Sequence, residues 1–217
     1  MKGLGNEVFG AKTPWMRVVP VEKDVPQQME IFPYEKASEI IQSADIICVA
    51  DCVCRKEQKL VGAGCDAPAD NCLVFSHWAN YYIENGWGRQ INKEEALEVL
   101  NKAEEAGLVH CSNNTEAGHF AICNCCGCCC GILRGITHLD NPQAVAKSDF
   151  VLAIDAEACV GCEVCVDRCH VKALAVEDGV AQLDADRSAV ESVSRPVPLR
   201  PYLFRGKKIV SRRRLMR

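Results

Sequence analysis

Apolar and polar positions follow a helical period most clearly over residues 92–106. Leu97 and Leu100 are three positions apart, which places them on one face of an α-helix. Asn92 is a favourable N-cap residue, and Gly107 follows where helices commonly end in a left-handed residue. The sequence therefore predicts a helix over this stretch.

Shorter patterns predict the other elements. Apolar runs bounded by turn residues indicate strands, and apolar positions at helical spacing indicate helices. The expected elements are helices over 33–44 and 73–84, strands over 46–50 and 150–155, a hairpin from 108–111 and 119–123, and a hairpin from 173–176 and 180–183 across Asp178-Gly179. The helix and hairpin between residues 92 and 123 resemble the second half of a winged helix.

These elements predict an α+β fold with two structured parts. A helical, winged-helix-like α+β domain is expected first, followed by a smaller ferredoxin-like domain. The predicted division is an irregular lead over 1–32, a cysteine-rich domain over 33–141, a linker over 142–149, a truncated ferredoxin domain over 150–187 and a basic tail over 188–217.

The chain of 217 residues contains 16 cysteines, and this number requires a chemical reason. Disulfides would need an oxidising compartment, but residues 1–20 lack the continuous apolar stretch of a signal peptide. No stretch approaches the roughly 18 apolar residues of a membrane span. We therefore expect a cytoplasmic protein whose thiols hold metal or do redox work.

The most regular cysteine motif is C-x2-C-x2-C-x3-C. It consists of Cys159, Cys162, Cys165 and Cys169. This spacing is typical of ligands to a [4Fe–4S] cluster. Zinc is the rival, although zinc sites usually pair two C-x2-C units across a longer loop. Gly161 is expected to let the backbone approach the cluster.

The segment over 150–187 resembles bacterial two-cluster ferredoxin domains. The resemblance implies that Cys159, Cys162 and Cys165 bind one cluster and that Cys169 binds a second. The sequence departs from this family at His170, where proline is usual, and it lacks the second motif. If Cys159, Cys162 and Cys165 lack their fourth ligand for this reason, their site holds a labile or three-iron cluster, recruits His170 or water as a ligand, or stays empty.

The tail differs in charge from the rest of the chain. Residues 188–217 contain nine Lys and Arg and one acidic residue, which leaves 16 basic and 28 acidic residues in 1–187. Shifted by two bases, the possible codons of 188–198 permit Gly-Cys-Gly-Val-Cys-Val-Ser-Ala-Cys-Pro, most of the missing motif, although these codons are degenerate. We interpret the tail as translated out of frame; the rival is a basic arm that binds nucleic acid or acidic lipid.

The remaining cysteines form two groups along the chain. One group spans residues 52–72, and the other is the run CNCCGCCC over 123–130. Adjacent cysteines point apart, so the run cannot serve a single ion, but it can serve two centres. We expect the two groups to meet, with metal ligands among Cys52, Cys54, Cys65, Cys72, Cys123, Cys125, Cys126 and Cys129.

The stretch over 33–187 resembles a family of ferredoxin-domain proteins from anaerobic bacteria and archaea. The shared patterns are C-x-C-R at 52–55, C-D-x-P-x-x-x-C-L at 65–73, and E-N-G-x-x-R-x-I-x-K-E-E-A-L at 84–97. E-E-A-G-L-V-H at 104–110 and I-C-N-C-C-x-C-C at 122–129 complete them. The resemblance implies further iron–sulfur ligation.

Several neighbouring residues allow narrower expectations. Cys48 and Cys111 lie in apolar runs and are expected in the core. Arg55 either stabilises the negative charge of a cluster or lies in solvent. The aromatic residues of the predicted helix over 73–84, Trp78 and Tyr81 among them, are expected to pack in the core.

These features favour an iron–sulfur electron carrier, or an electron-transfer subunit of a larger oxidoreductase, over a catalyst. A redox protein is the expected partner. Nucleic acid is not expected, because residues 1–187 have a net charge of −12. Two alternatives stay open: a redox- or metal-responsive regulator with a winged-helix-like domain, and an enzyme that uses a cluster with one open iron.

Overall fold

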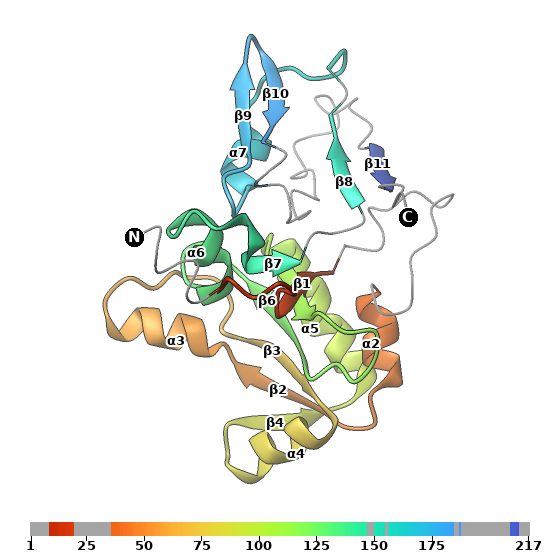
Figure 1. Ribbon diagram of the computed structural model, residues 1–217. Helices are drawn as coiled ribbons and strands as arrows, with labels where there is room; N and C mark the ends of the chain where they lie inside the picture. Colours follow the sequence, from red (N-terminus) through yellow and green to blue (C-terminus); the bar gives the residue numbers. More distant parts are fainter. Residues whose placement is uncertain are drawn as a thin grey trace.

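The main body of the protein is a seven-stranded sheet with helices on both faces (Figure 1). This computed structural model describes residues 9–19, 36–146, 150–154, 156–184, 187 and 209–212. The strands lie in the order β4 (Gly88–Ile91), β2 (Ile47–Asp51), β3 (Asp70–Phe75), β6 (Ala121–Cys125), β5 (Val109–Asn113), β1 (Met16–Val18) and β7 (Val145–Ala146). Neighbouring strands are antiparallel, except that β1 and β7 are parallel. This mixture of helices and sheet is compatible with the predicted α+β class.

Each face of the sheet has its own helices because side chains alternate along a strand. In β3, Leu73 and Phe75 pack with helices α2 (Ala37–Ser43) and α5 (Lys93–Glu105). Val74 points the other way and packs with helix α4 (Ser76–Glu84). Farther along that second face, helix α6 (Gly131–Thr137) packs beside β5 and β1.

The helix predicted over 92–106 is confirmed as α5. The Asn92 side chain accepts a hydrogen bond of 2.8 Å from the backbone N–H of Glu95, which caps the first turn. Ala96, Leu100 and Ala103 are its apolar buried residues. The helix ends before Gly107, whose φ of +74° fits the expected left-handed position.

The hairpin that follows α5 is confirmed, but it does not form a free wing. Strands β5 and β6 pair with each other, and β6 also pairs with β3 while β5 also pairs with β1. The hairpin is therefore interior to the sheet. A winged-helix fold is not confirmed, and neither is a specific ferredoxin fold.

Three other stretches differ from the predicted elements. The helix expected over 73–84 begins only at Ser76, because residues 70–75 form the buried strand β3 between β2 and β6. Residues 16–18, expected in the irregular lead, form β1. Residues 142–146, expected in the linker, form a 3-10 turn (Pro142–Ala144) and strand β7. Strands β1 and β7 add to the sheet through backbone pairing that local sequence pattern does not reveal.

The part of the chain after β7 contains two small two-stranded sheets (Figure 1). One is the predicted hairpin of β9 (Leu174–Glu177) and β10 (Val180–Leu183), whose turn residues Asp178 and Gly179 both have positive φ. It follows the short helix α7 (Val164–Arg168). The other pairs β8 (Phe150–Ala153) with β11 (Ile209–Arg212). The rest of the predicted tail lies outside the described residues.

The remaining helix, α3 (Val53–Leu60), follows β2 directly and precedes the loop that carries Cys65. None of the helices in the described part of the chain has the length and apolar character needed to cross a lipid bilayer.

The cap of α5 gives a test of the local structure. Replacing Asn92 with alanine removes the hydrogen bond to Glu95, so we expect Asn92→Ala to lower the free energy of unfolding by about 1 kcal/mol. Urea denaturation followed by circular dichroism measures the change. Asn101→Ala, on an exposed position of the same helix, is the matched control and should not destabilise; equal effects of the two substitutions would contradict the capping role.

Candidate metal centres

Strand β6 and the turn after it contain six cysteines and direct them to both faces of the sheet. Cys123 and Cys125 lie two positions apart and pack against the core on the α6 face. Cys126, the next residue after the strand, packs on the other face with Ala103 of α5. Cys130 directly precedes α6. The run therefore divides between two locations, as expected for adjacent cysteines.

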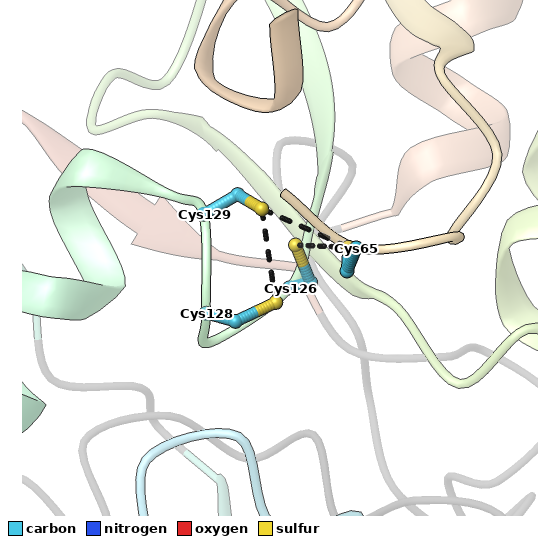
Figure 2. Close-up of side chains that lie close together, drawn as sticks. All are labelled: Cys65, Cys126, Cys128 and Cys129. Atoms are coloured by element: carbon cyan, nitrogen blue, oxygen red, sulfur yellow. Dashed lines mark hydrogen bonds between the residues drawn. The ribbon is translucent and has the colours of Figure 1, made fainter. Parts of the chain in front are cut away.

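Four thiols meet where the turn after β6 approaches the loop after α3 (Figure 2). Their sulfur atoms all lie within 4.8 Å of one another, and we call this set the four-thiol group: Cys65, Cys126, Cys128 and Cys129. The Sγ atom of Cys65 lies 3.7 Å from the Sγ atoms of Cys126 and Cys129. The Sγ atoms of Cys128 and Cys129 are also 3.7 Å apart.

The spacing of these sulfur atoms fits one tetrahedrally coordinated metal ion. Metal–thiolate bonds of about 2.3 Å in a regular tetrahedron give sulfur–sulfur edges of about 3.8 Å. The three distances of 3.7 Å agree with such an edge. Four thiolates suit both zinc and iron, so the geometry indicates a metal site without specifying the metal.

Proton affinities differ among these thiols. Burial alone would raise the pKa of Cys65, but hydrogen bonds with the backbone of Ala67 and with the Cys128 and Cys129 thiols lower that pKa to about 7. Burial raises the pKa of Cys129 to about 11, and burial also raises the pKa of Cys128. A metal must therefore displace protons from at least two thiols that would otherwise stay neutral near pH 7.

Arg55 supplies a buried positive charge beside the four-thiol group. Its side chain is fully buried. It donates hydrogen bonds to three uncharged oxygen acceptors: the carbonyl of Pro68 at 2.8 Å, Oδ1 of Asn71 at 3.0 Å and the carbonyl of Asn124 at 2.8 Å. Within the described ranges, no carboxylate pairs with it and its Nε atom has no hydrogen-bond partner. An isolated buried charge is costly, so the site requires an anion.

The ionisable groups that act on Arg55 are cysteine thiols. Burial tends to lower the pKa of the guanidinium, but interaction with the ionised forms of Cys126 and Cys52 raises that pKa overall. Arg55 also interacts with the Cys65 side chain. The expectation that Arg55 stabilises negative charge at the cysteines thus agrees with its position, and the alternative of a solvent-exposed arginine is wrong.

The hydrogen bonds of Arg55 also fix the backbone that carries the thiols. Its contact with Pro68 holds the loop after Cys65, and its contact with Asn124 holds β6 just before Cys126. Asn124 in turn donates through Nδ2 to the carbonyl of Asn71 at 2.6 Å. The cation therefore links the two segments that form the four-thiol group.

A second set of thiols lies nearer the α4 and α6 face, and we call it the six-thiol group: Cys52, Cys54, Cys72, Cys123, Cys125 and Cys130. Interactions with the thiols of Cys125 and Cys54 lower the pKa of Cys130 to about 5. Interactions with Cys125 and Cys72 likewise hold the pKa of Cys123 well below its ordinary value. The protonation of each of these thiols therefore depends on the protonation of its neighbours.

The ferredoxin-like motif has three thiols in one region and one apart. Cys159 and Cys165 are half-buried and Cys162 is exposed, whereas Cys169 is buried in the core beside β5 and α6. Burial raises the pKa of Cys165, and the nearby charges of Cys162 and Cys159 raise it further. Cys165 also packs against the core cluster that contains Cys169, and the division of ligands that the resemblance implies stays a prediction.

Backbone N–H groups donate hydrogen bonds to two sulfur atoms of this motif. The N–H of Ala181 donates to Sγ of Cys159 at 3.3 Å, and the N–H of Ala173 donates to Sγ of Cys169 at 3.1 Å. Hydrogen bonds to sulfur tune iron–sulfur centres. Gly161 has a φ of +63°, and a Cβ atom there would come within 2.7 Å of the Gly179 carbonyl. Gly161 is therefore required for packing against the β9–β10 turn.

His170 is held by two backbone groups. Its Nδ1 accepts a hydrogen bond of 3.2 Å from the N–H of Gly127, and its Nε2 donates to the carbonyl of Gly107 at 2.8 Å. Burial lowers the pKa of His170, which fits the neutral form that this pattern requires. Both ring nitrogens are engaged, so the structure gives no support to His170 as a replacement cluster ligand; the residue connects the motif to the turn of the four-thiol group.

Sequence reasoning identified most of these positions but missed two. The eight predicted metal ligands all fall into one of the two groups, and the expected meeting of residues 52–72 with 123–130 is confirmed. Cys128 and Cys130 were not singled out. The feature of the sequence that indicates them is the turn residue Gly127, which lies between β6 and these two cysteines. The chain reverses at this turn, so the thiols that follow it return to the region of the preceding cysteines.

The expectations for the other residues had mixed outcomes. Cys48 and Cys111 are fully buried in the core, as predicted. Trp78 and Tyr81 do not pack in the core: they are 45% and 47% exposed, and they contact each other and other aromatic rings on the surface. Helix α4 covers the edge of the sheet, so most of its aromatic residues face outward.

Comparison with protein-family models, curated proteins and solved structures finds no significant match to this chain.

The contact between Gly127 and His170 gives a second test. A Cβ atom on Gly127 would lie 2.2 Å from the His170 carbonyl oxygen, so Gly127→Ala must displace the backbone on one side. We expect it to lower the free energy of unfolding by about 1–3 kcal/mol, measured by urea denaturation. Gly131→Ala, where a Cβ atom meets nothing within 4 Å, is the matched control. The close contact would be disproved by unchanged stability of Gly127→Ala.

Proposed function

We propose that this protein binds iron through its cysteines and transfers electrons to or from a redox protein partner. The observation that carries the proposal is the four-thiol group next to the fully buried Arg55. Four thiolates around a metal leave a net negative charge, and the guanidinium supplies the opposite charge in a region from which water is excluded. A site of this kind stabilises a metal centre in more than one oxidation state.

The ferredoxin-like motif supports iron rather than another metal. Its C-x2-C-x2-C-x3-C spacing is typical of [4Fe–4S] ligands, and backbone N–H groups donate to two of its sulfur atoms. On this proposal Cys159, Cys162 and Cys165 hold a cluster of the [4Fe–4S] type with an incomplete ligand set. The resemblance to ferredoxin-domain proteins of anaerobes supports the same assignment.

The four-thiol group would hold its own metal in a different way. Cys65, Cys126, Cys128 and Cys129 would each supply one thiolate, and bound iron would supply the reversible one-electron chemistry. Arg55 keeps two of the contributing segments in register through Pro68 and Asn124. Its fixed charge favours the state in which the centre has gained an electron.

Zinc is the second candidate, because the sulfur–sulfur distances of 3.7 Å fit a single tetrahedral ion and zinc prefers such closed four-thiolate sites. A zinc protein would favour the metal-responsive regulator over the electron carrier. The interior position of the β5–β6 hairpin and the acidic charge of residues 1–187 weigh against a regulator that binds nucleic acid.

Metal analysis decides between these functions. We expect the full chain, purified without oxygen, to contain iron and acid-labile sulfide and to show broad absorption near ~400 nm that dithionite bleaches. Zinc without iron or sulfide would support the regulator and overturn the proposal.

A cysteine substitution tests the four-thiol group directly. Cys128 is the exposed member, so Cys128→Ala should leave the fold intact and lower the bound iron by one atom per chain. Cys48→Ala, a buried cysteine outside both thiol groups, is the control and should retain the iron of the wild type. Iron per folded chain, measured by mass spectrometry of the metal, should therefore separate the two variants. Equal iron contents would exclude iron at this group.

Arg55 gives a test of the redox role. Arg55→Met removes the buried cation, so the reduced centre loses stabilisation and its reduction potential should fall by roughly 60 mV or more, a tenfold change in the one-electron equilibrium. Anaerobic potentiometric titration measures the potential. Lys56→Met removes a neighbouring cation that is exposed and paired with Asp51 at 2.6 Å, and it should leave the potential nearly unchanged. A fall of the same size in both variants would contradict a specific role for Arg55.

A further inference from the structure

The six-thiol group is built mainly by adjacent strands of the sheet. The register that pairs Leu73 with Ile122 continues to Cys72 opposite Cys123, on neighbouring strands β3 and β6. Cys125 lies two residues beyond Cys123 and therefore on the same face. Three cysteines of two strands thus point to one side of the sheet.

The other members come from the residues that open two helices. Cys52 directly precedes α3 and Cys54 is its second residue, while Cys130 directly precedes α6. The thiol of Cys54 interacts with those of both Cys52 and Cys130. Segments more than 70 residues apart in the chain therefore meet through sulfur.

Packing brings several of these thiols together. Cys125 and Cys130 lie in one cluster of buried core residues, and Cys123 packs against that cluster. Cys72 lies on the strand next to Cys123, and the interactions that shift the pKa values of these thiols run from Cys130 through Cys125 and Cys123 to Cys72. Cysteines whose only role is to fill a core make contacts with hydrocarbon side chains. In contrast, four members of the six-thiol group are only half-buried.

The arrangement is too spread out for a single ion. Among the residues that the structure describes, the four-thiol group is the set of ligand atoms found within 4.8 Å of one another, and no three members of the six-thiol group meet that limit. A tetrahedral ion needs sulfur–sulfur edges of about 3.8 Å. Several irons bridged by sulfide hold their thiolates farther apart and use more of them.

The group also has a route to solvent. Cys72 lines an open cavity of about 670 Å³ whose wall includes Tyr82 and Trp87. Iron and sulfide can reach the thiols through this cavity during assembly.

We propose that the six-thiol group binds an iron–sulfur cluster of more than one iron, as a centre separate from the four-thiol group and from the ferredoxin-like motif. Four of the six thiols would suffice as ligands. The inference goes beyond the proposed electron-transfer function and does not require a metal at the four-thiol group, because the two groups share no cysteine.

The test uses the full chain with the other sites disabled. Cys128→Ala, Cys159→Ala and Cys162→Ala combined remove one exposed ligand from the four-thiol group and two from the motif. This triple variant is reconstituted without oxygen using ferrous iron and sulfide. We expect more than one iron, with matching acid-labile sulfide, to remain on each chain. Adding Cys52→Ala, Cys54→Ala, Cys72→Ala and Cys123→Ala removes the four half-buried members of the six-thiol group and leaves fewer thiols than a cluster needs, so it should abolish both. Adding Cys48→Ala should change neither.

Three results would overturn this inference: a triple variant without iron, iron without sulfide, or iron and sulfide that persist after the four half-buried members of the six-thiol group are replaced. Circular dichroism confirms that each variant is folded before its metal is counted. Loss of iron from the triple variant with normal iron in the wild type would leave the proposed function intact. A wild type without iron would reject the proposed function itself.

Discussion

A buried positive charge with no carboxylate partner among the described residues is the constraint on which the rest of the structure depends. Arg55 lies in the interior, and the hydrogen bonds that fix its position go to backbone carbonyls and an amide oxygen. These acceptors orient the guanidinium but do not neutralise it. Cysteine thiols are the ionisable groups that surround it, and they would bind a metal as thiolates. On the proposed function, the cation and the metal would stabilise each other through the sulfur atoms between them.

The alternation of side chains along β6 explains why so many cysteines can lie close together without forming a single site. Cys123 and Cys125 are directed to one face and Cys126 to the other, so the sheet separates the thiols into two groups. Arg55 influences both groups because it enters from α3, next to Cys52 and Cys54. His170 then connects the ferredoxin-like motif to the turn at Gly127. The four-thiol group, the six-thiol group and the ferredoxin-like motif are thus connected through side-chain contacts within one fold.

The sequence predicted local features better than long-range ones. The helix α5, its Asn92 cap and the Asp178-Gly179 turn depend on neighbouring residues, and their patterns were sufficient. The strand β3 was taken for the start of a helix because its apolar run continues into α4 without a break, and only pairing with β2 and β6 makes it a strand.

The candidate sites show the same limit. The cysteine motifs predicted metal binding, and the four-thiol group could hold a metal ion. The partner of Cys126 is Cys65, 61 residues earlier, and no local pattern joins them. The burial of Arg55 also depends on tertiary packing, so its two possible roles could not be separated from the sequence.

X-ray absorption at the iron edge, on full-length protein prepared without oxygen, tests the central claim most directly. If the thiols hold the iron, the first coordination shell consists of sulfur at about 2.3 Å, the usual metal–thiolate distance. A first shell of nitrogen or oxygen at about 2.0–2.2 Å would show that the iron is bound elsewhere and would contradict this account.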